Sequence, residues 1–89
     1  MRVEVLLFGP PRDTAGIPEE KISIEKGSKL EDLVRLLKVR HGPTFSKAVR
    51  GKGSTIILVN GLNPDSLEGM KTVLKDGDTV AILPATFGG

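Results

Sequence analysis

The residues best suited to chemistry are the last two of the chain, Gly88 and Gly89. They follow a hydrophobic, strand-like run from Asp78 to Leu83 that is broken by Pro84. Glycine has no Cβ, so other groups can approach its main chain closely, and a carboxylate carried on it can be attacked without steric shielding. The pattern therefore favours a thin tail that is inserted into a partner. The alternative is a frayed end, because domain termini are commonly disordered.

The rest of the composition excludes most other chemistry. The chain has no Cys and a single His, His41, which rules out thiol catalysis, disulfides and Cys-ligated metal sites. Its 89 residues leave little room for an enclosed catalytic cavity. We therefore expect a protein that is not itself an enzyme and that binds no metal. His41 precedes Gly42-Pro43 at a predicted helix end, where we expect it to cap the helix.

Charge and hydropathy predict an ordinary cytoplasmic protein. Thirteen basic and eleven acidic residues are interspersed and give a net charge of +2, which is not the footprint of a nucleic-acid-binding protein. The first apolar stretch contains Glu4 and reaches Gly9-Pro10-Pro11 at once, so it predicts neither a signal peptide nor a membrane span. We expect no nucleic-acid partner and no membrane partner.

One amphipathic helix and four strands are predicted. Leu30, Leu33, Val34 and Leu37 form one apolar stripe, after a predicted capping box from Ser28 to Glu31. The continuous β-branched run 55–59 is typical of a central strand and is closed by Asn60-Gly61. The other predicted strands span 2–8, which Pro10-Pro11 ends, 21–25, and 79–83, which follows a hairpin-type turn at Asp76-Gly77.

The remaining segments are predicted to connect these elements. Residues 43–53 are polar and basic, which favours a surface loop or a short helical turn. Within them, Gly51-Lys52-Gly53-Ser54 lacks the first glycine and the spacing of a phosphate-binding loop, so we do not assign it to a nucleotide. Residues 62–74 are predicted to be an irregular connector with room for one short strand and a helical turn.

These elements predict an α+β protein with the β-grasp (ubiquitin-like) fold. A single amphipathic helix must bury its apolar face against a sheet. A mixed sheet of four to five strands with the helix across one face buries the apolar sides of both elements. The first and last strands can pair in parallel at the centre of that sheet. We therefore expect a domain of residues 1–84 whose middle strand leads into a flexible tail, 85–89.

Three stretches carry a specific resemblance: Leu7-Phe8 with Arg12 and Gly16, Leu58-Val59-Asn60-Gly61, and Leu74 to Pro84 followed by Gly88-Gly89. In these stretches the chain resembles the MoaD/ThiS group of ubiquitin-like sulfur carriers, and most closely archaeal-type MoaD, the small subunit of molybdopterin synthase, and SAMP-like modifiers. The resemblance implies that a MoeB/ThiF-type, E1-like enzyme uses ATP to adenylate the carboxylate of Gly89, with Gly88 as its spacer. Sulfur transfer then gives a thiocarboxylate, and the carrier itself binds no cofactor.

The resemblance also implies a docking face. Phe8 and Leu83, with Leu62 as the nearest third candidate, match apolar residues that dock on the E1-like enzyme and on the large, MoaE-type synthase subunit. Arg12 matches an arginine near that face. Family tails begin Pro-Pro, whereas here Ala85 follows Pro84, and Phe87 stands immediately before Gly88. We expect Pro84 and Phe87 to contact the partner, Phe87 either filling a pocket or obstructing a channel.

Three classes of function stay open at this point. The first is a sulfur carrier for molybdopterin synthesis, with thiazole synthesis as a variant pathway. The second is a protein modifier that is joined through Gly89 to lysines of other proteins. The third is a plain binding module in which the Gly-Gly pair is incidental. The first two begin with the same adenylation step, so the sequence does not separate them.

Overall fold

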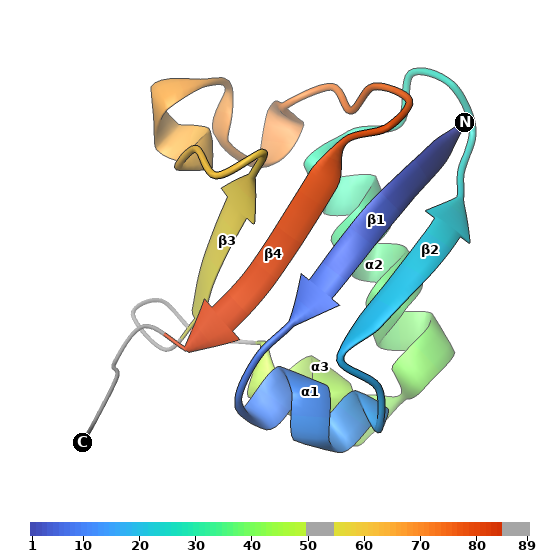
Figure 1. The fold of residues 1–89 in the computed structure, drawn as a ribbon, viewed down its shortest axis with the longest axis vertical. Helices are drawn as coiled ribbons and strands as arrows, with labels where there is room; N and C mark the ends of the chain where they lie inside the picture. The colour runs from blue at the N-terminus through green and yellow to red at the C-terminus, as the bar shows by residue number, and fades with distance from the viewer. Residues whose placement is uncertain (50–54, 85–89) are drawn as a thin grey trace.

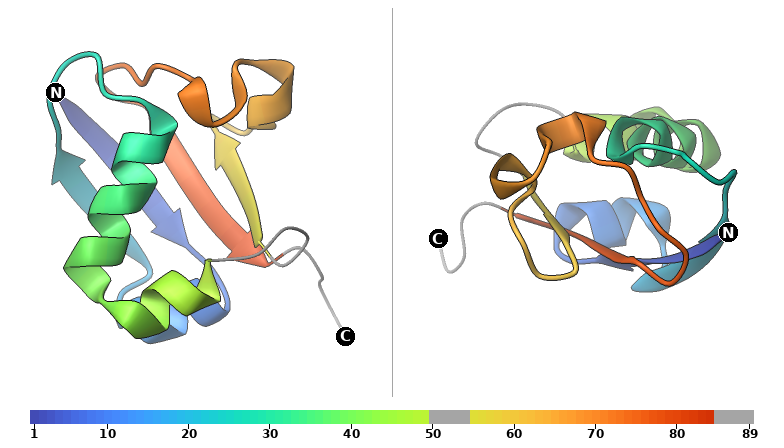
Figure 2. Two further views of the ribbon diagram at one scale, coloured as in Figure 1. Left: turned by 180° about the vertical axis from the view of Figure 1, so that it is seen from behind. Right: turned by 90° about the horizontal axis from the view of Figure 1, so that it is seen from above.

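The computed structural model describes residues 1–49 and 55–84, and in them it shows a four-stranded mixed sheet with its helices on one side (Figure 1, Figure 2). This confirms the predicted α+β class and the β-grasp fold. The predicted tail, 85–89, and the Gly51-Lys52-Gly53-Ser54 segment lie outside the described residues. The strands are β1 (Arg2–Leu7), β2 (Glu19–Ser23), β3 (Thr55–Val59) and β4 (Thr79–Pro84), in the order β2-β1-β4-β3.

The first and last strands pair in parallel at the centre of the sheet, as predicted. The register runs from Glu4 opposite Thr79 to Leu7 opposite Ile82. β2 and β3 each pair antiparallel, with β1 and β4 respectively. The C-terminal ends of β1 and β4 therefore lie at the same end of the sheet, opposite the N-terminus (Figure 1).

The main helix, α2 (Leu30–His41), covers the sheet with its predicted apolar stripe. Inward and outward side chains alternate along each strand, and the four stripe residues are buried against the inward set. The buried hydrophobic residues are Val3, Val5, Leu7, Ile22, Leu30, Leu33, Val34, Leu37, Phe45, Val59, Leu74, Val80 and Ile82.

The predicted capping box is wrong by one residue. The helix is capped at Lys29, whose backbone N–H donates to the carboxylate of Asp32 at 2.9 Å. The hydroxyl of Ser28 instead donates to the carbonyl of Glu25 at 2.7 Å. The Glu31 carboxylate lies 2.9 Å from the ammonium of Lys71. Both side chains are therefore engaged away from the helix start.

The structure contains two short helices, of which one was not predicted and the other falls in the segment predicted as a surface loop or a short helical turn. α1 (Pro10–Ala15) begins at the proline pair that ends β1, because proline is tolerated in the first turn of a helix. α3 (Pro43–Ala48) follows α2 and buries Phe45 completely. The connector after β3 contains two single-turn 3-10 helices, η1 (Pro64–Ser66) and η2 (Gly69–Lys71).

The prediction of a central strand at 55–59 is wrong, because β3 is an edge strand. A continuous apolar run predicts burial on both faces, yet four of the five residues here are only half-buried. The Asn60-Gly61 turn is as predicted: Leu62 and Val59 exchange backbone hydrogen bonds of 2.9 Å across it.

The Asp76-Gly77 turn joins the connector to β4, and its bonds go to β1 rather than closing a hairpin. The Asp76 carboxylate accepts from the backbone N–H of Arg2, and the N–H of Gly77 donates to the Arg2 carbonyl, both at 2.8 Å. The next residue, Asp78, accepts from the Asn60 side chain at 2.9 Å. The first two bonds hold the starts of β1 and β4 together in their parallel register, and the third ties the start of β4 to the end of β3.

His41 does not cap its helix, contrary to the prediction. Its Nε2 lies 2.9 Å from the Glu20 carboxylate, and both side chains are largely buried. The other oxygen of Glu20 forms an ion pair with Arg40, whose Nε lies 2.6 Å away. The end of α2 is thereby tied to β2, which gives His41 a structural role.

We predict that Leu33→Ala lowers the free energy of unfolding by roughly 2–5 kcal/mol, because it removes a side chain that is 0% exposed in the core. The matched control is Val39→Ala on the same helix, where the side chain is 79% exposed and the change should stay within about 0.5 kcal/mol. Urea denaturation measures both. Equal effects would contradict the assigned helix face.

Candidate functional site

The face of the sheet that no helix covers carries the candidate site. The helices lie on the other face (Figure 2), so the outward side chains of β1, β4 and β3 are left open. The strand register aligns these side chains in rows across the sheet. Two rows near the end of β4 are apolar, and the rows further away are polar.

The apolar rows form one continuous patch, which we call the tail-end patch. One row extends the β1 to β4 register by one residue, placing Phe8 beside Leu83, and Leu83 pairs with Ile56. The second row is Leu6, Ala81 and Leu58. Phe8 is 43% exposed and the other five residues are partly exposed. An apolar patch of this kind on a small domain indicates a protein-binding surface.

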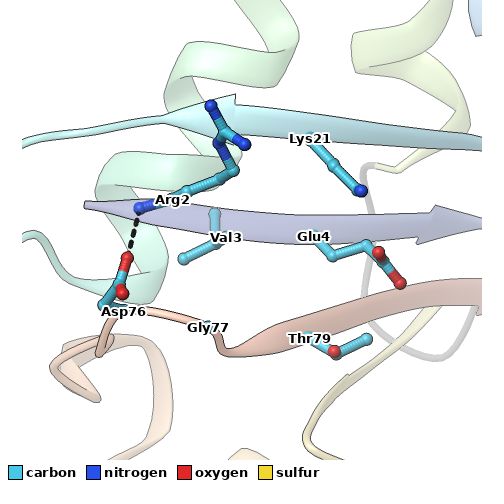
Figure 3. A pocket seen from close by; sticks show the side chains of 7 residues that line it. All are labelled: Arg2, Val3, Glu4, Lys21, Asp76, Gly77 and Thr79. Carbon is cyan, nitrogen blue, oxygen red and sulfur yellow. Dashed lines mark hydrogen bonds between the residues drawn. The ribbon is translucent and has the colours of Figure 1, made fainter.

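The polar end of the same face surrounds a shallow pocket of about 270 Å³. Figure 3 shows Arg2 and Glu4 on β1, with Lys21 from β2 and Thr79 from β4 beside them. Glu4 stands directly opposite Lys21 in the antiparallel register. Charges of both signs meet here without a nucleophile and base in contact, so the pocket is suited to a polar rim rather than to catalysis.

The base of the tail is fixed by Gly9, which follows Phe8. Gly9 has φ of +64° and packs so closely that a Cβ built on it would meet the Pro84 ring at 3.0 Å. The backbone N–H of Phe8 donates to the Ile82 carbonyl at 3.0 Å. Pro84, the last described residue, is therefore held beside the end of β1.

The predicted partner-binding residues are only partly brought together. Phe8, Leu83 and Pro84 lie at the same end of the sheet. Arg12 is exposed on α1, with its Nε 3.8 Å from the Asp13 carboxylate. Leu62 is 54% exposed but follows the turn at the opposite end of β3, away from Phe8. Phe87, Gly88 and Gly89 lie outside the described residues.

Four members of the patch were not predicted from the sequence: Leu6, Ile56, Leu58 and Ala81. The signal was present in β3, where an apolar run without a charge was interpreted as a central strand. Because β3 is an edge strand with one covered face, its outward residues Ile56 and Leu58 are available for contact instead.

Among residues 1–49 and 55–84, no group of three or more His, Cys, Asp or Glu side chains is arranged to hold a metal ion. None of the described helices is both long and apolar enough to cross a membrane.

The fold and its open face define a small ubiquitin-like protein with an exposed apolar patch at one end of its sheet. The chain belongs to the ThiS family, whose model matches residues 5–89. The molybdopterin synthase sulfur carrier subunit of Chlamydomonas reinhardtii is 32% identical over 90 residues, and the match covers 100% of both chains.

Two solved structures extend the comparison. The small archaeal modifier protein 1 of Methanosarcina acetivorans is 36% identical, with a TM-score of 0.82, covering 99% of this chain and 96% of that one. The chain also matches a chain in the complex of subunits 1 and 2 of the molybdopterin-converting factor of Helicobacter pylori. The identity is 26% and the TM-score 0.65, and the match covers 100% of each chain. The resemblance predicted from sequence is thus confirmed. Family membership also confirms that the chain is a carrier protein without enzymatic activity or a bound cofactor of its own.

We predict that Gly9→Ala lowers the free energy of unfolding by about 1–3 kcal/mol, because a side chain is strained at this φ and would press on Pro84. The NMR signals of Pro84 should shift. Gly16→Ala is the control: Gly16 also has positive φ, but its Cβ would meet nothing within 4 Å. Unchanged Pro84 signals in Gly9→Ala would show that Gly9 does not fix the tail base.

Proposed function

We propose that this chain is a sulfur carrier whose C-terminal Gly89 is adenylated by an E1-like enzyme and converted to a thiocarboxylate, as the small subunit of a molybdopterin synthase. The observation that carries the proposal is the position of the tail base. Pro84 ends a central strand and stands beside the tail-end patch, so a partner bound to that patch is next to the residue after which the Gly-Gly segment begins.

Activation proceeds in two steps. The Gly89 carboxylate attacks the α-phosphorus of ATP, which releases pyrophosphate and leaves an acyl-adenylate. Hydrosulfide delivered by a partner then attacks the acyl carbon, the bond from that carbon to the AMP oxygen breaks so that AMP leaves, and loss of the S–H proton gives the thiocarboxylate. A carboxylate is a poor acyl donor until it becomes a mixed anhydride, so the enzyme supplies the catalysis and this chain supplies the acyl group.

The chain's own residues provide docking and presentation. Phe8, Leu83 and Ile56 form the row nearest the tail base, and their burial against a partner supplies the apolar core of the interface. Pro84 and Phe87 lead from that row to Gly88. Both partners, the E1-like enzyme and the large synthase subunit, would use the same face in turn in the cytoplasm.

A protein-modifier function is the second candidate, favoured by the 36% identity to a small archaeal modifier protein. The same adenylate would then be passed on and end in an amide with a lysine amine of a target protein. The match to the ThiS family model keeps thiazole synthesis as a third pathway for the same thiocarboxylate. All three begin with adenylation at Gly89.

We predict that a cognate E1-like enzyme with ATP forms an acyl-adenylate on the intact chain, measured as carrier-dependent exchange of pyrophosphate into ATP. Deleting Gly88-Gly89 should abolish the exchange. The melting temperature of the deletion variant serves as the control, and we expect it to be unchanged, since a short tail contributes little packing. Adenylation that persists without the glycines would refute the function.

We further predict that Phe8→Asp and Leu83→Asp each weaken binding to the E1-like enzyme by about tenfold or more, because a charge is buried at the centre of the interface. Titration calorimetry measures the affinity. Val39→Asp, on the opposite, helical side, is the control and should bind normally. Unfolding should stay cooperative in all three variants. Loss of the fold in Phe8→Asp or Leu83→Asp would instead assign that residue to the core.

A further inference from the structure

The two edges of the sheet differ in how they are protected against pairing. β2 carries Glu19, Glu20 and Lys21, and charged side chains are a common way of blunting an edge strand. β3 contains Thr, Ile, Ile, Leu and Val, with no charge and no proline. An unprotected apolar edge of this kind is a template for another strand.

The hydrogen-bond pattern identifies which groups on β3 are open. Asn60 N–H donates to the Thr79 carbonyl at 2.7 Å, so by antiparallel alternation Leu58 and Ile56 also bond to β4. The backbone N–H and C=O groups of the alternate residues, Val59, Ile57 and Thr55, therefore point away from β4. Leu62 already pairs with Val59. Among the described residues, the backbone N–H and C=O of Ile57 have no hydrogen-bond partner.

A groove runs beside these open groups. Its volume is about 550 Å³, and the connector forms its other wall. Thr55 and Ile57 on β3 line one wall of the groove, and Pro64 and Met70 on the connector line the other. An extended segment in this groove could bond to Ile57 and contact apolar side chains on both walls.

The same geometry disfavours a second copy of β3 as the occupant. Antiparallel pairing of two β3 strands about Ile57 would place Val59 opposite Thr55 of the other copy. Because the bonds of Val59 are taken by Leu62, a single bonded pair, Ile57 with itself, would remain. An extended segment can therefore pair with Thr55 to Ile57, whereas the β3 edge of a second folded copy cannot.

We propose that the E1-like enzyme contributes an extended segment that adds to the sheet along Thr55 to Ile57. This inference rests on the proposed function and specifies how the partner holds the carrier. Thr55 pairs with Pro84, and successive strands are about 4.8 Å apart, so the added strand lies roughly 10 Å from the tail base. It would be continuous with the tail-end patch through Ile56.

Amide hydrogen exchange on the isotope-labelled carrier tests the proposal directly. On addition of the E1-like enzyme, exchange at the Ile57 amide should slow by about tenfold or more. The Leu58 amide, already bonded to β4, is the internal reference and should change much less. Slowed exchange at Ile57 that appears in the carrier alone on raising its concentration would indicate self-pairing and overturn the proposal.

A pair of proline variants provides the functional test. Ile57→Pro removes an outward N–H without breaking the β4 ladder, and proline is tolerated at such edge positions. We expect the KM for the carrier to rise about tenfold in pyrophosphate exchange with kcat retained. Ser23→Pro removes an outward N–H from the opposite edge strand and is the control. If Ile57→Pro does not fold, Met70→Trp fills the groove instead, with exposed Val39→Trp as its control.

The outcomes distinguish a failure of the proposed strand addition from a failure of the proposed function. Normal adenylation with unchanged exchange at Ile57, or with equal KM for the test and control variants, overturns the strand addition and leaves the proposed function standing. Absence of any adenylation of the unaltered carrier refutes the proposed function and this inference together.

Discussion

The parallel pairing of β1 with β4 is the constraint on which the rest of the structure depends. It places the last strand at the centre of the sheet, with its end beside the end of the first strand. The pairing is between segments at opposite ends of the chain, so it carries a loop-closure cost that local contacts do not. The bonds from Asp76 and Gly77 to Arg2 help to hold it. A different register would move Leu83 and Phe8 apart.

Covering only one face of this sheet produces the site. α2 buries one set of alternating side chains, and the opposite set is left to contact solvent or a partner. The apolar part of the open face lies next to Pro84, whereas Arg2, Glu4 and Lys21 lie at the far end. The arrangement suits a protein whose folded part provides recognition, while its tail provides the reacting group.

The elements with strong periodicity were predictable from sequence, and those that depend on neighbouring elements were not. The stripe of α2 and the alternation in β2 specify their own buried faces. α1 and α3 are short and begin with proline, so their formation depends on packing against each other and on burial of Phe45. The edge position of β3 depends on which strand pairs with β4, and an apolar run does not encode that choice.

The candidate site was predicted in the same uneven way. Phe8 and Leu83 were predicted together because both match apolar docking residues of the family that the chain resembles, and the strand register places them side by side. Leu6, Ile56 and Leu58 join them only through the register across three strands, which the linear sequence does not display. Leu62 was named only as the nearest apolar candidate for a third docking residue, and the turn after Val59 places it at the other end of β3.

The most direct test of the account is the intact mass of the carrier after incubation with its E1-like enzyme, ATP and a sulfur donor. The account predicts that one oxygen is replaced by one sulfur, and that fragmentation places the change on Gly89. The change should be absent when ATP is omitted. A carrier whose mass stays the same with an enzyme that is active on its own substrate, or a sulfur located elsewhere in the chain, would contradict it.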